Sequence, residues 1–134
     1  MELKPWPEVA AMVRTLRERG TRLAILSNTT AAMMHACVKA SGLESAFDFQ
    51  LSTDHVKAFK PDPSAYQMSL DAFHLRKKEI AFAAFGGWDA VGAKAFGHPT
   101  YWVNRFNMPS EELGLFADFT SQNLSSLPSF LKST

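Results

Sequence analysis

Short apolar runs alternate with helical segments along almost the whole of this 134-residue chain. Such alternation is typical of a parallel sheet whose right-handed crossovers place helices on both faces. We therefore expect an α/β fold with three layers, α/β/α, in a single domain at 1–134. The expected strands are at residues 23–26, 47–51, 80–85 and 101–104, with a short edge segment at 116–119.

Helices are predicted where apolar residues recur on one face. In the first, at 7–19, Val9, Met12, Val13 and Leu16 follow the i, i+3, i+4, i+7 spacing. The others are expected at 30–41, 63–74 and 88–96, with a last turn at 128–131, and Asn28-Thr29-Thr30 offers N-caps for the second. Runs 23–26 and 80–85 lack alternation, which predicts strands buried on both faces. The run at 47–51 alternates, as a strand nearer an edge does.

Composition excludes several functional classes. The net charge is +1 with scattered Lys and Arg, which argues against nucleic acid as a partner. No apolar run approaches the roughly 20 residues that span a bilayer, and the N-terminus has no signal-peptide core. The single cysteine, Cys37, allows no internal disulfide and is expected to be an inert buried thiol. We therefore expect a soluble cytoplasmic protein. No metal site is expected, because the histidines lack ligand spacing: His35, His55, His74 and His98.

Three polar loops lie where an open parallel sheet would bind ligands, beyond the carboxyl ends of its strands. They are Leu26-Ser27-Asn28-Thr29, Phe59-Lys60-Pro61-Asp62-Pro63 and Phe85-Gly86-Gly87-Trp88-Asp89. Each residue of these loops that we single out could instead have a purely structural role. Ser27 and Asn28, or Asp89, could cap the helix that follows, and Lys60 could be a solvated loop lysine. Tyr66 could be half-buried packing, and Trp88 could belong to the core.

These loops, in this order, resemble the haloacid dehalogenase superfamily, and within it the type II L-2-haloacid dehalogenases. The resemblance runs from Leu3 to about Leu131 and implies a Rossmann-like sheet of strand order 3-2-1-4-5. The segments that carry it are Leu3-Lys4-Pro5-Trp6-Pro7, Ala24-Ile25-Leu26-Ser27-Asn28, Ala58-Phe59-Lys60-Pro61-Asp62-Pro63-Ser64-Ala65-Tyr66, Trp88-Asp89-Ala90-Val91-Gly92-Ala93 and Trp102-Val103-Asn104-Arg105.

The resemblance implies hydrolytic removal of halide from a short 2-haloalkanoic acid, without metal or organic cofactor. An Asp carboxylate attacks the carbon that bears the halide, and water then hydrolyses the ester. Lys60 would place a positive charge beside that carboxylate, and Asp89 would help position the hydrolytic water or its ionic neighbours. The implied catalytic residues are Lys60, Ser27 and Asp89, and the implied substrate-binding residues are Asn28, Tyr66 and Trp88.

The third loop departs from the family pattern. Dehalogenases of this type usually carry Ser-Ser-Asn-Ala before Trp-Asp, whereas this chain has Ala84-Phe85-Gly86-Gly87. Ala84 and Gly86 thus stand where hydroxyl and amide groups are expected, which bears on ester hydrolysis. Gly87 also replaces the first Asp of the magnesium-binding pattern of related phosphatases, so a phosphatase fragment is the less favoured alternative.

The family's nucleophile strand and cap are not found in this sequence. None of its candidate aspartates has the apolar strand and Gly-containing loop that such a nucleophile needs: Asp48, Asp54, Asp62, Asp71, Asp89 and Asp118. The expected chain is a truncated C-terminal core whose central first strand is missing and which is inactive alone. The flanking strands could then pair directly, a complementing segment or a homodimer could fill the gap, or the chain could be a fragment. A non-catalytic binding module is the other alternative.

Overall fold

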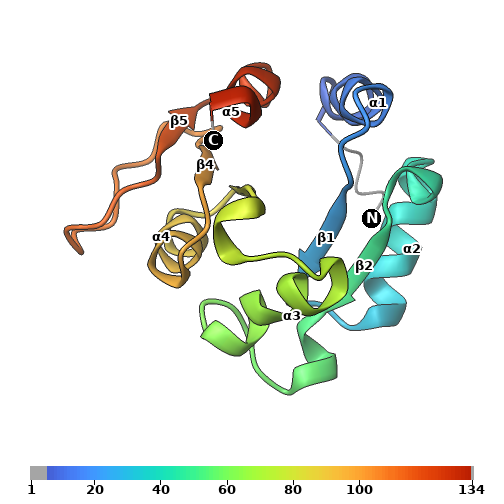
Figure 1. Cartoon of the computed structure of the whole chain (residues 1–134), viewed down its shortest axis with the longest axis horizontal. Helices are drawn as coiled ribbons and strands as arrows, with labels where there is room; N and C mark the ends of the chain where they lie inside the picture. Colours follow the sequence, from blue (N-terminus) through green and yellow to red (C-terminus); the bar gives the residue numbers. More distant parts are fainter. Residues whose placement is uncertain (1–5, 134) are drawn as a thin grey trace. The chain divides into compact units, whose positions relative to one another are not determined.

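The computed structural model describes residues 6–133 (Figure 1), so Leu3-Lys4-Pro5 of the family-like segment lies outside the described residues. The chain divides into two compact units, Met1–Phe59 and Lys60–Thr134, each described here by itself. Unit 1 contains α1 (Val9–Glu18), β1 (Ala24–Ser27), α2 (Ala31–Ser41) and β2 (Phe49–Ser52). Unit 2 contains α3 (Pro63–Phe73), β3 (Phe82–Ala84), α4 (Gly87–Phe96), β4 (Thr100–Val103), β5 (Phe119–Ser121) and α5 (Leu127–Ser133). Single 3₁₀ turns lie at Glu44–Ala46, Thr53–Val56 and Lys77–Glu79.

In unit 1, β1 and β2 are parallel, with Ala24 opposite Phe49 and Ser27 opposite Ser52. Helix α2 packs against β2 (Figure 1) and buries Met34 and Val38. Cys37 is exposed, so the prediction of a buried thiol is wrong. The reason is geometric, because successive helical residues turn by about 100° and Cys37 falls off the face that Met34 and Val38 share.

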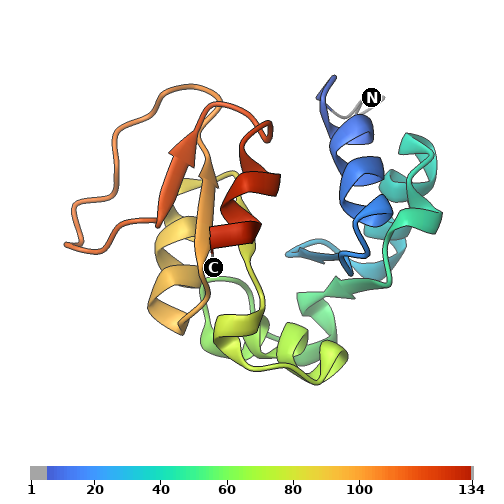
Figure 2. The same ribbon diagram turned by 45° about the horizontal axis from the view of Figure 1, so that its top comes forward.

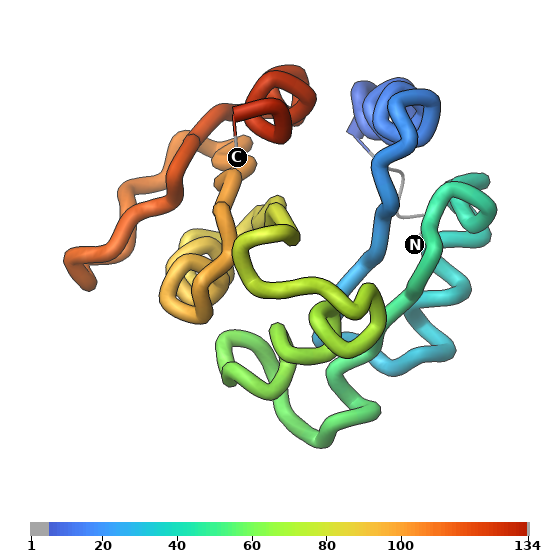
Figure 3. Tube along the Cα trace, in the orientation of Figure 1, coloured from blue at the N-terminus to red at the C-terminus, as the bar shows by residue number. Residues whose placement is uncertain are grey.

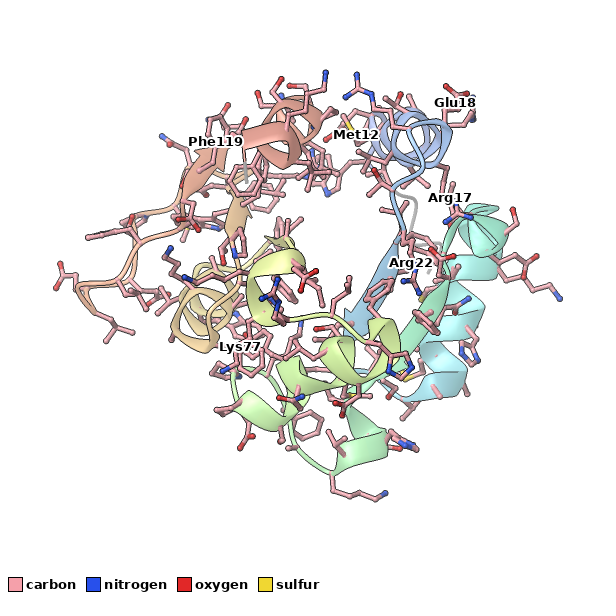
Figure 4. The ribbon with its side chains drawn as sticks, viewed as in Figure 1. Met12, Arg17, Glu18, Arg22, Lys77 and Phe119 are labelled. Carbon is pink, nitrogen blue, oxygen red and sulfur yellow. The ribbon has the colours of Figure 1, made fainter. Side chains whose placement is uncertain are left out.

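An ion pair connects α1 with the segment that precedes β2. Arg17, labelled in Figure 4, donates to Asp48 Oδ2 at 2.7 Å, and the Leu23 backbone N–H donates to the same oxygen at 2.8 Å. The bond from Leu23 has the largest effect, and together the two bonds hold the pKa of Asp48 below its usual value. On the inner face of α1, Val13 and Leu16 are buried, as the periodicity predicts.

In unit 2, β3, β4 and β5 form a parallel sheet in that order. Strand β4 lies between α4 and α5 in both ribbon views (Figures 1 and 2). Alternation along β4 explains this layering, because neighbouring strand residues point to opposite faces. Trp102 packs with Ala84 and Ala90 on the α4 side, whereas the Tyr101 ring packs against Phe130 of α5.

A long loop joins β4 to β5 and extends away from the rest of unit 2 (Figure 3). Asp118 fixes its far end, accepting the Thr100 backbone N–H at 2.8 Å and pairing with Lys94 Nζ at 2.6 Å. Burial opposes ionisation of this carboxyl, but the bonds from Lys94 and Thr100 hold the pKa of Asp118 below its usual value. The edge strand β5 starts at Phe119, so the predicted edge segment over 116–119 overlaps it only at its last residue.

The predicted α/β order and the predicted strand pairs, β1 with β2 and β3 with β4, are confirmed. Within unit 1 the described strands form a two-stranded sheet, and within unit 2 they form a three-stranded sheet. Burial of β1 and β3 on both faces is wrong: β1 is half-buried throughout, and Ala83 is exposed. Each of these strands has one neighbour within its described sheet, which leaves its other side uncovered.

Candidate active site

Unit 2 holds a buried ion pair between Lys60 and Asp89. Lys60 Nζ lies 2.8 Å from Asp89 Oδ2, and the two side chains are 10% and 8% exposed. Lys60 comes from the loop before α3, and its ammonium also lies 5.5 Å from the centre of the Phe82 ring. The alternative of a solvated loop lysine is therefore wrong. A charge pair this far from water is stable only when both partners stay in place.

Tyr66 completes the network from the middle of α3. Its side chain is fully buried, and Oη donates to Asp89 Oδ1 at 2.7 Å and to the Asp89 carbonyl oxygen at 3.2 Å. Burial first, and the Asp89 carboxylate second, raise the pKa of the Tyr66 hydroxyl well above its ordinary value. The hydroxyl is thus a fixed neutral donor, and half-buried packing is a wrong description of it.

Asp89 is held at this place by the start of α4. The N-cap is Gly86, so Asp89 is the third helical residue and does not cap the helix, as one alternative had it. A carboxylate in the first turn also interacts favourably with the helix dipole. Both carboxylate oxygens are engaged, Oδ1 by Tyr66 and Oδ2 by Lys60.

Unit 1 carries a second polar cluster at the carboxyl ends of β1 and β2. Ser27 Oγ lies 2.9 Å from Thr29 Oγ1 and accepts the Thr29 backbone N–H at 3.2 Å. Thr53 Oγ1 donates to Asn28 Oδ1 at 3.2 Å. The cap of α2 is Thr30, which accepts the Met33 backbone N–H, so Ser27 and Asn28 are not the helix cap.

Two residues of this cluster were missed in the sequence, Ser52 and Thr53. The Ser52 hydroxyl donates to the Thr29 carbonyl oxygen at 2.5 Å, and the Thr53 side chain is fully buried against Asn28. A signal was present, because both residues follow directly on the predicted strand at 47–51. The rule that selected Ser27 and Asn28, position beyond the carboxyl end of a strand, selects them as well.

Trp88 lies on the surface of α4, 47% exposed, so the core-packing alternative is wrong. It lines a hollow of about 380 Å³ together with Val91, Ala95 and Leu113, whereas Lys60, Tyr66 and Asp89 do not line it. The Trp88 ring also covers Gly86, since a Cβ at that position would lie 2.7 Å from the indole nitrogen. The indole therefore takes the space that a side chain at position 86 would need.

The structure thus brings together Lys60, Tyr66 and Asp89 within unit 2, and Ser27 and Asn28 within unit 1. Ala84 is buried in the core beside Trp102, 1% exposed. Among residues 6–133 there is no group of three or more His, Cys, Asp or Glu that could hold a metal ion. Over the same range, no helix has the length and apolar character needed to cross a membrane.

Comparison with known proteins gives a consistent picture. Residues 1–97 match the family model for haloacid dehalogenase-like hydrolases. Haloacetate dehalogenase H-2 of Moraxella sp. (strain B) is 44% identical over 90% of this chain and 54% of its own length. An (S)-2-haloacid dehalogenase of Pseudomonas sp. (strain YL) is 40% identical over 92% of this chain and 53% of its own length.

Solved structures agree. The L-2-haloacid dehalogenase of Xanthobacter autotrophicus superposes with a TM-score of 0.92 at 27% identity, over 99% of this chain and 63% of that one. A second L-2-haloacid dehalogenase gives 0.94 at 36% identity, over 97% of this chain and 57% of that one. The chain spans about half the length of the curated relatives it matches. The chain belongs to the haloacid dehalogenase-like hydrolases, and the two curated relatives named above are a haloacetate dehalogenase and an (S)-2-haloacid dehalogenase.

Proposed function

We propose that this chain forms part of the core of an enzyme that hydrolyses short 2-haloalkanoic acids and releases halide. The observation that carries the proposal is the buried Lys60–Asp89 pair bonded to Tyr66, in a member of this family. An ammonium held away from water stabilises negative charge more strongly than a solvated one, because the local dielectric is lower. A charged network of this kind is also costly to bury, which favours a functional reason for it.

In the proposed reaction, a carboxylate displaces the halide at the substrate carbon, and water attacks the carboxyl carbon of the resulting ester. Lys60 would stabilise the charge of the attacking carboxylate, and Asp89 would hold Lys60 in position. Ser27 and Asn28 would offer hydrogen bonds to the substrate carboxylate. Trp88 would form an apolar wall for the substrate.

We propose further that the 134-residue polypeptide does not turn over by itself. Three aspartates of the described residues already have charged partners: Asp89 pairs with Lys60 and accepts from Tyr66, Asp48 pairs with Arg17, and Asp118 pairs with Lys94. Asp62 caps α3 by accepting the Ser64 backbone N–H at 2.8 Å. A carboxylate that already serves as a structural partner is a poorer nucleophile, because each hydrogen bond or ion pair stabilises its negative charge.

Two experiments on the purified polypeptide test the proposal. With 2-chloropropionate as substrate, halide release should not exceed the rate in buffer, and steady multiple turnover would contradict the expected inactivity. Titration with 2-chloropropionate, followed by ¹⁵N NMR, should move the side-chain amide signals of Asn28. Absence of any shift there at tens of millimolar ligand would count against a haloacid site. Magnesium-dependent cleavage of p-nitrophenyl phosphate would favour a phosphatase instead.

We also propose that a complementing segment or a second copy of the chain is a partner of this protein, and that the protein is cytoplasmic. Strand β1 supports the first part, because within the described residues it pairs with β2 alone. An unpaired strand edge is a template for another strand. Analytical ultracentrifugation tests it, and a clean monomer over the whole micromolar range would argue against self-association.

A further inference from the structure

Gly92 occupies the interior of α4, where glycine is a poor helix former. Its backbone does not explain the choice, because the glycines of the described chain with positive φ are Gly20, Gly42, Gly97 and Gly114. Space does explain it. A Cβ at position 92 would lie 2.5 Å from Tyr66 Oη and 2.6 Å from Pro61 Cβ, far inside ordinary contact distance.

Both atoms belong to segments that make up the charged network. Tyr66 Oη is the hydroxyl that donates to Asp89, and Pro61 directly follows Lys60, whose ammonium pairs with Asp89. Asp89 and Gly92 are three residues apart in one helix, so they lie on neighbouring positions of the same face. Gly92, which has no side chain, thus lies directly beside the network.

We propose that Gly92 is a positioning residue: its lack of a side chain lets the Tyr66 hydroxyl and the Lys60-Pro61 segment close on Asp89. A methyl group there would need roughly 1 Å more room toward Tyr66 than it has. The Tyr66–Asp89 bond is 2.7 Å long, and hydrogen bonds between oxygens weaken beyond about 3 Å. A displacement of Tyr66 by about 1 Å would therefore break its hydrogen bond to Asp89.

The test uses the two tyrosines of the chain, Tyr66 and Tyr101, labelled with ¹³C at Cζ. Cζ shifts report ionisation of each hydroxyl during an alkaline titration. His98, whose ring centre is 6.4 Å from that of Tyr66, is neutral in this range, so the other charges facing the hydroxyl are those of Lys60 and Asp89. In the wild type, Tyr66 should stay protonated well above about pH 10, the ordinary midpoint.

In Gly92→Ala, the Tyr66 signal should titrate at least about one pH unit lower than in the wild type, with Tyr101 unchanged. Gly87→Ala is the matched control in the same helix, since a Cβ there meets the Trp102 ring at 3.3 Å and no atom of the network. It should leave both signals unchanged. An unmoved Tyr66 signal in Gly92→Ala would overturn the inference. So would joint movement of both tyrosines, because Gly92 would then be needed for the fold as a whole.

The role of Gly92 depends on the proposed function only in one respect, namely what the Lys60–Asp89–Tyr66 network is used for. The tyrosine titration needs no turnover and no substrate. Failure of 2-chloropropionate to bind would therefore contradict the proposed function and leave the role of Gly92 standing, whereas an unmoved Tyr66 signal would contradict the role of Gly92 alone.

Discussion

Replacing Lys60 by methionine should destabilise unit 2 strongly. Methionine keeps an apolar stem but removes the cation, which lies 5.5 Å from the centre of the Phe82 ring, so the Asp89 carboxylate stays 8% exposed without its counter-charge. Removal of one partner of a buried pair costs about 3–5 kcal/mol. Because the Lys60 side chain is 10% exposed and Tyr66 still donates to Asp89, we expect the lower end, about 3 kcal/mol.

Urea unfolding at pH 7 measures this cost, with tryptophan fluorescence as the reporter. Trp102 of unit 2, 6% exposed, changes its surroundings most on unfolding, whereas Trp6 and Trp88 are already 46% and 47% exposed. Urea slopes of about 1–3 kcal/mol per molar convert 3 kcal/mol into a fall of about 1–3 M in the midpoint. Lys57→Met is the control. The Lys57–Asp54 pair is 3.8 Å long and its side chains are 82% and 61% exposed, so its loss should change the midpoint little.

A second variant separates the charge from the packing. Lys60→Met combined with Asp89→Asn removes both charges and keeps an oxygen that can accept from Tyr66. It should recover most of the stability that the single variant loses. A single variant within about 0.5 kcal/mol of the wild type would refute the reasoning, because Asp89 would then tolerate burial without its cation.

Two further outcomes are expected. Thr53→Val, which keeps the shape but removes the hydroxyl that donates to Asn28 at 3.2 Å, should cost about 1 kcal/mol in urea unfolding and move the Asn28 amide signals. Thr53→Ser keeps the hydroxyl and should leave those signals in place. Burial lowers the pKa of His98, despite the bond between Nδ1 and the Lys77 carbonyl oxygen at 2.8 Å. The unfolded chain therefore binds the proton first, so stability should fall as pH drops through about 6.5 and stop falling below the folded-state pKa. His98→Gln should flatten that slope between pH 7.5 and 5.5, and an equal slope in both proteins would contradict a buried neutral histidine.

Much of the fold follows from local signals in the sequence. The first helix is recognisable from the spacing of Val13 and Leu16. The second has Gly42, with φ near 73°, as its C-cap, and α3 begins at Pro63 after the N-cap Asp62. Such signals act over a few residues, so they are legible without the tertiary structure. Pairing of β1 with β2 and of β3 with β4 agrees with the strand order 3-2-1-4-5 that the family resemblance implies.

The candidate site was only partly predictable. Position beyond a strand selected Ser27 and Asn28, but the bond from Tyr66 to Asp89 depends on how closely α3 approaches α4, over 23 residues of sequence separation. No local pattern encodes that approach. Cys37 shows the same limit, because helical periodicity places it near Met34 and Val38 but does not say how wide the buried face is.

The network also constrains how Lys60 can act in the proposed reaction. Paired with Asp89 at 2.8 Å, the ammonium belongs to a group of net charge zero, and it attracts a distant anion far less than a lone lysine would. Its contribution is therefore short-range: a donor held in one place, which costs no reorganisation when charge develops beside it. A free lysine has about 2 kcal/mol of side-chain entropy to lose on being fixed, and in this fold Asp89 has already fixed it. In the proposed reaction Asp89 would then orient the cation, which agrees with both of its oxygens being bonded, one to Lys60 and one to Tyr66.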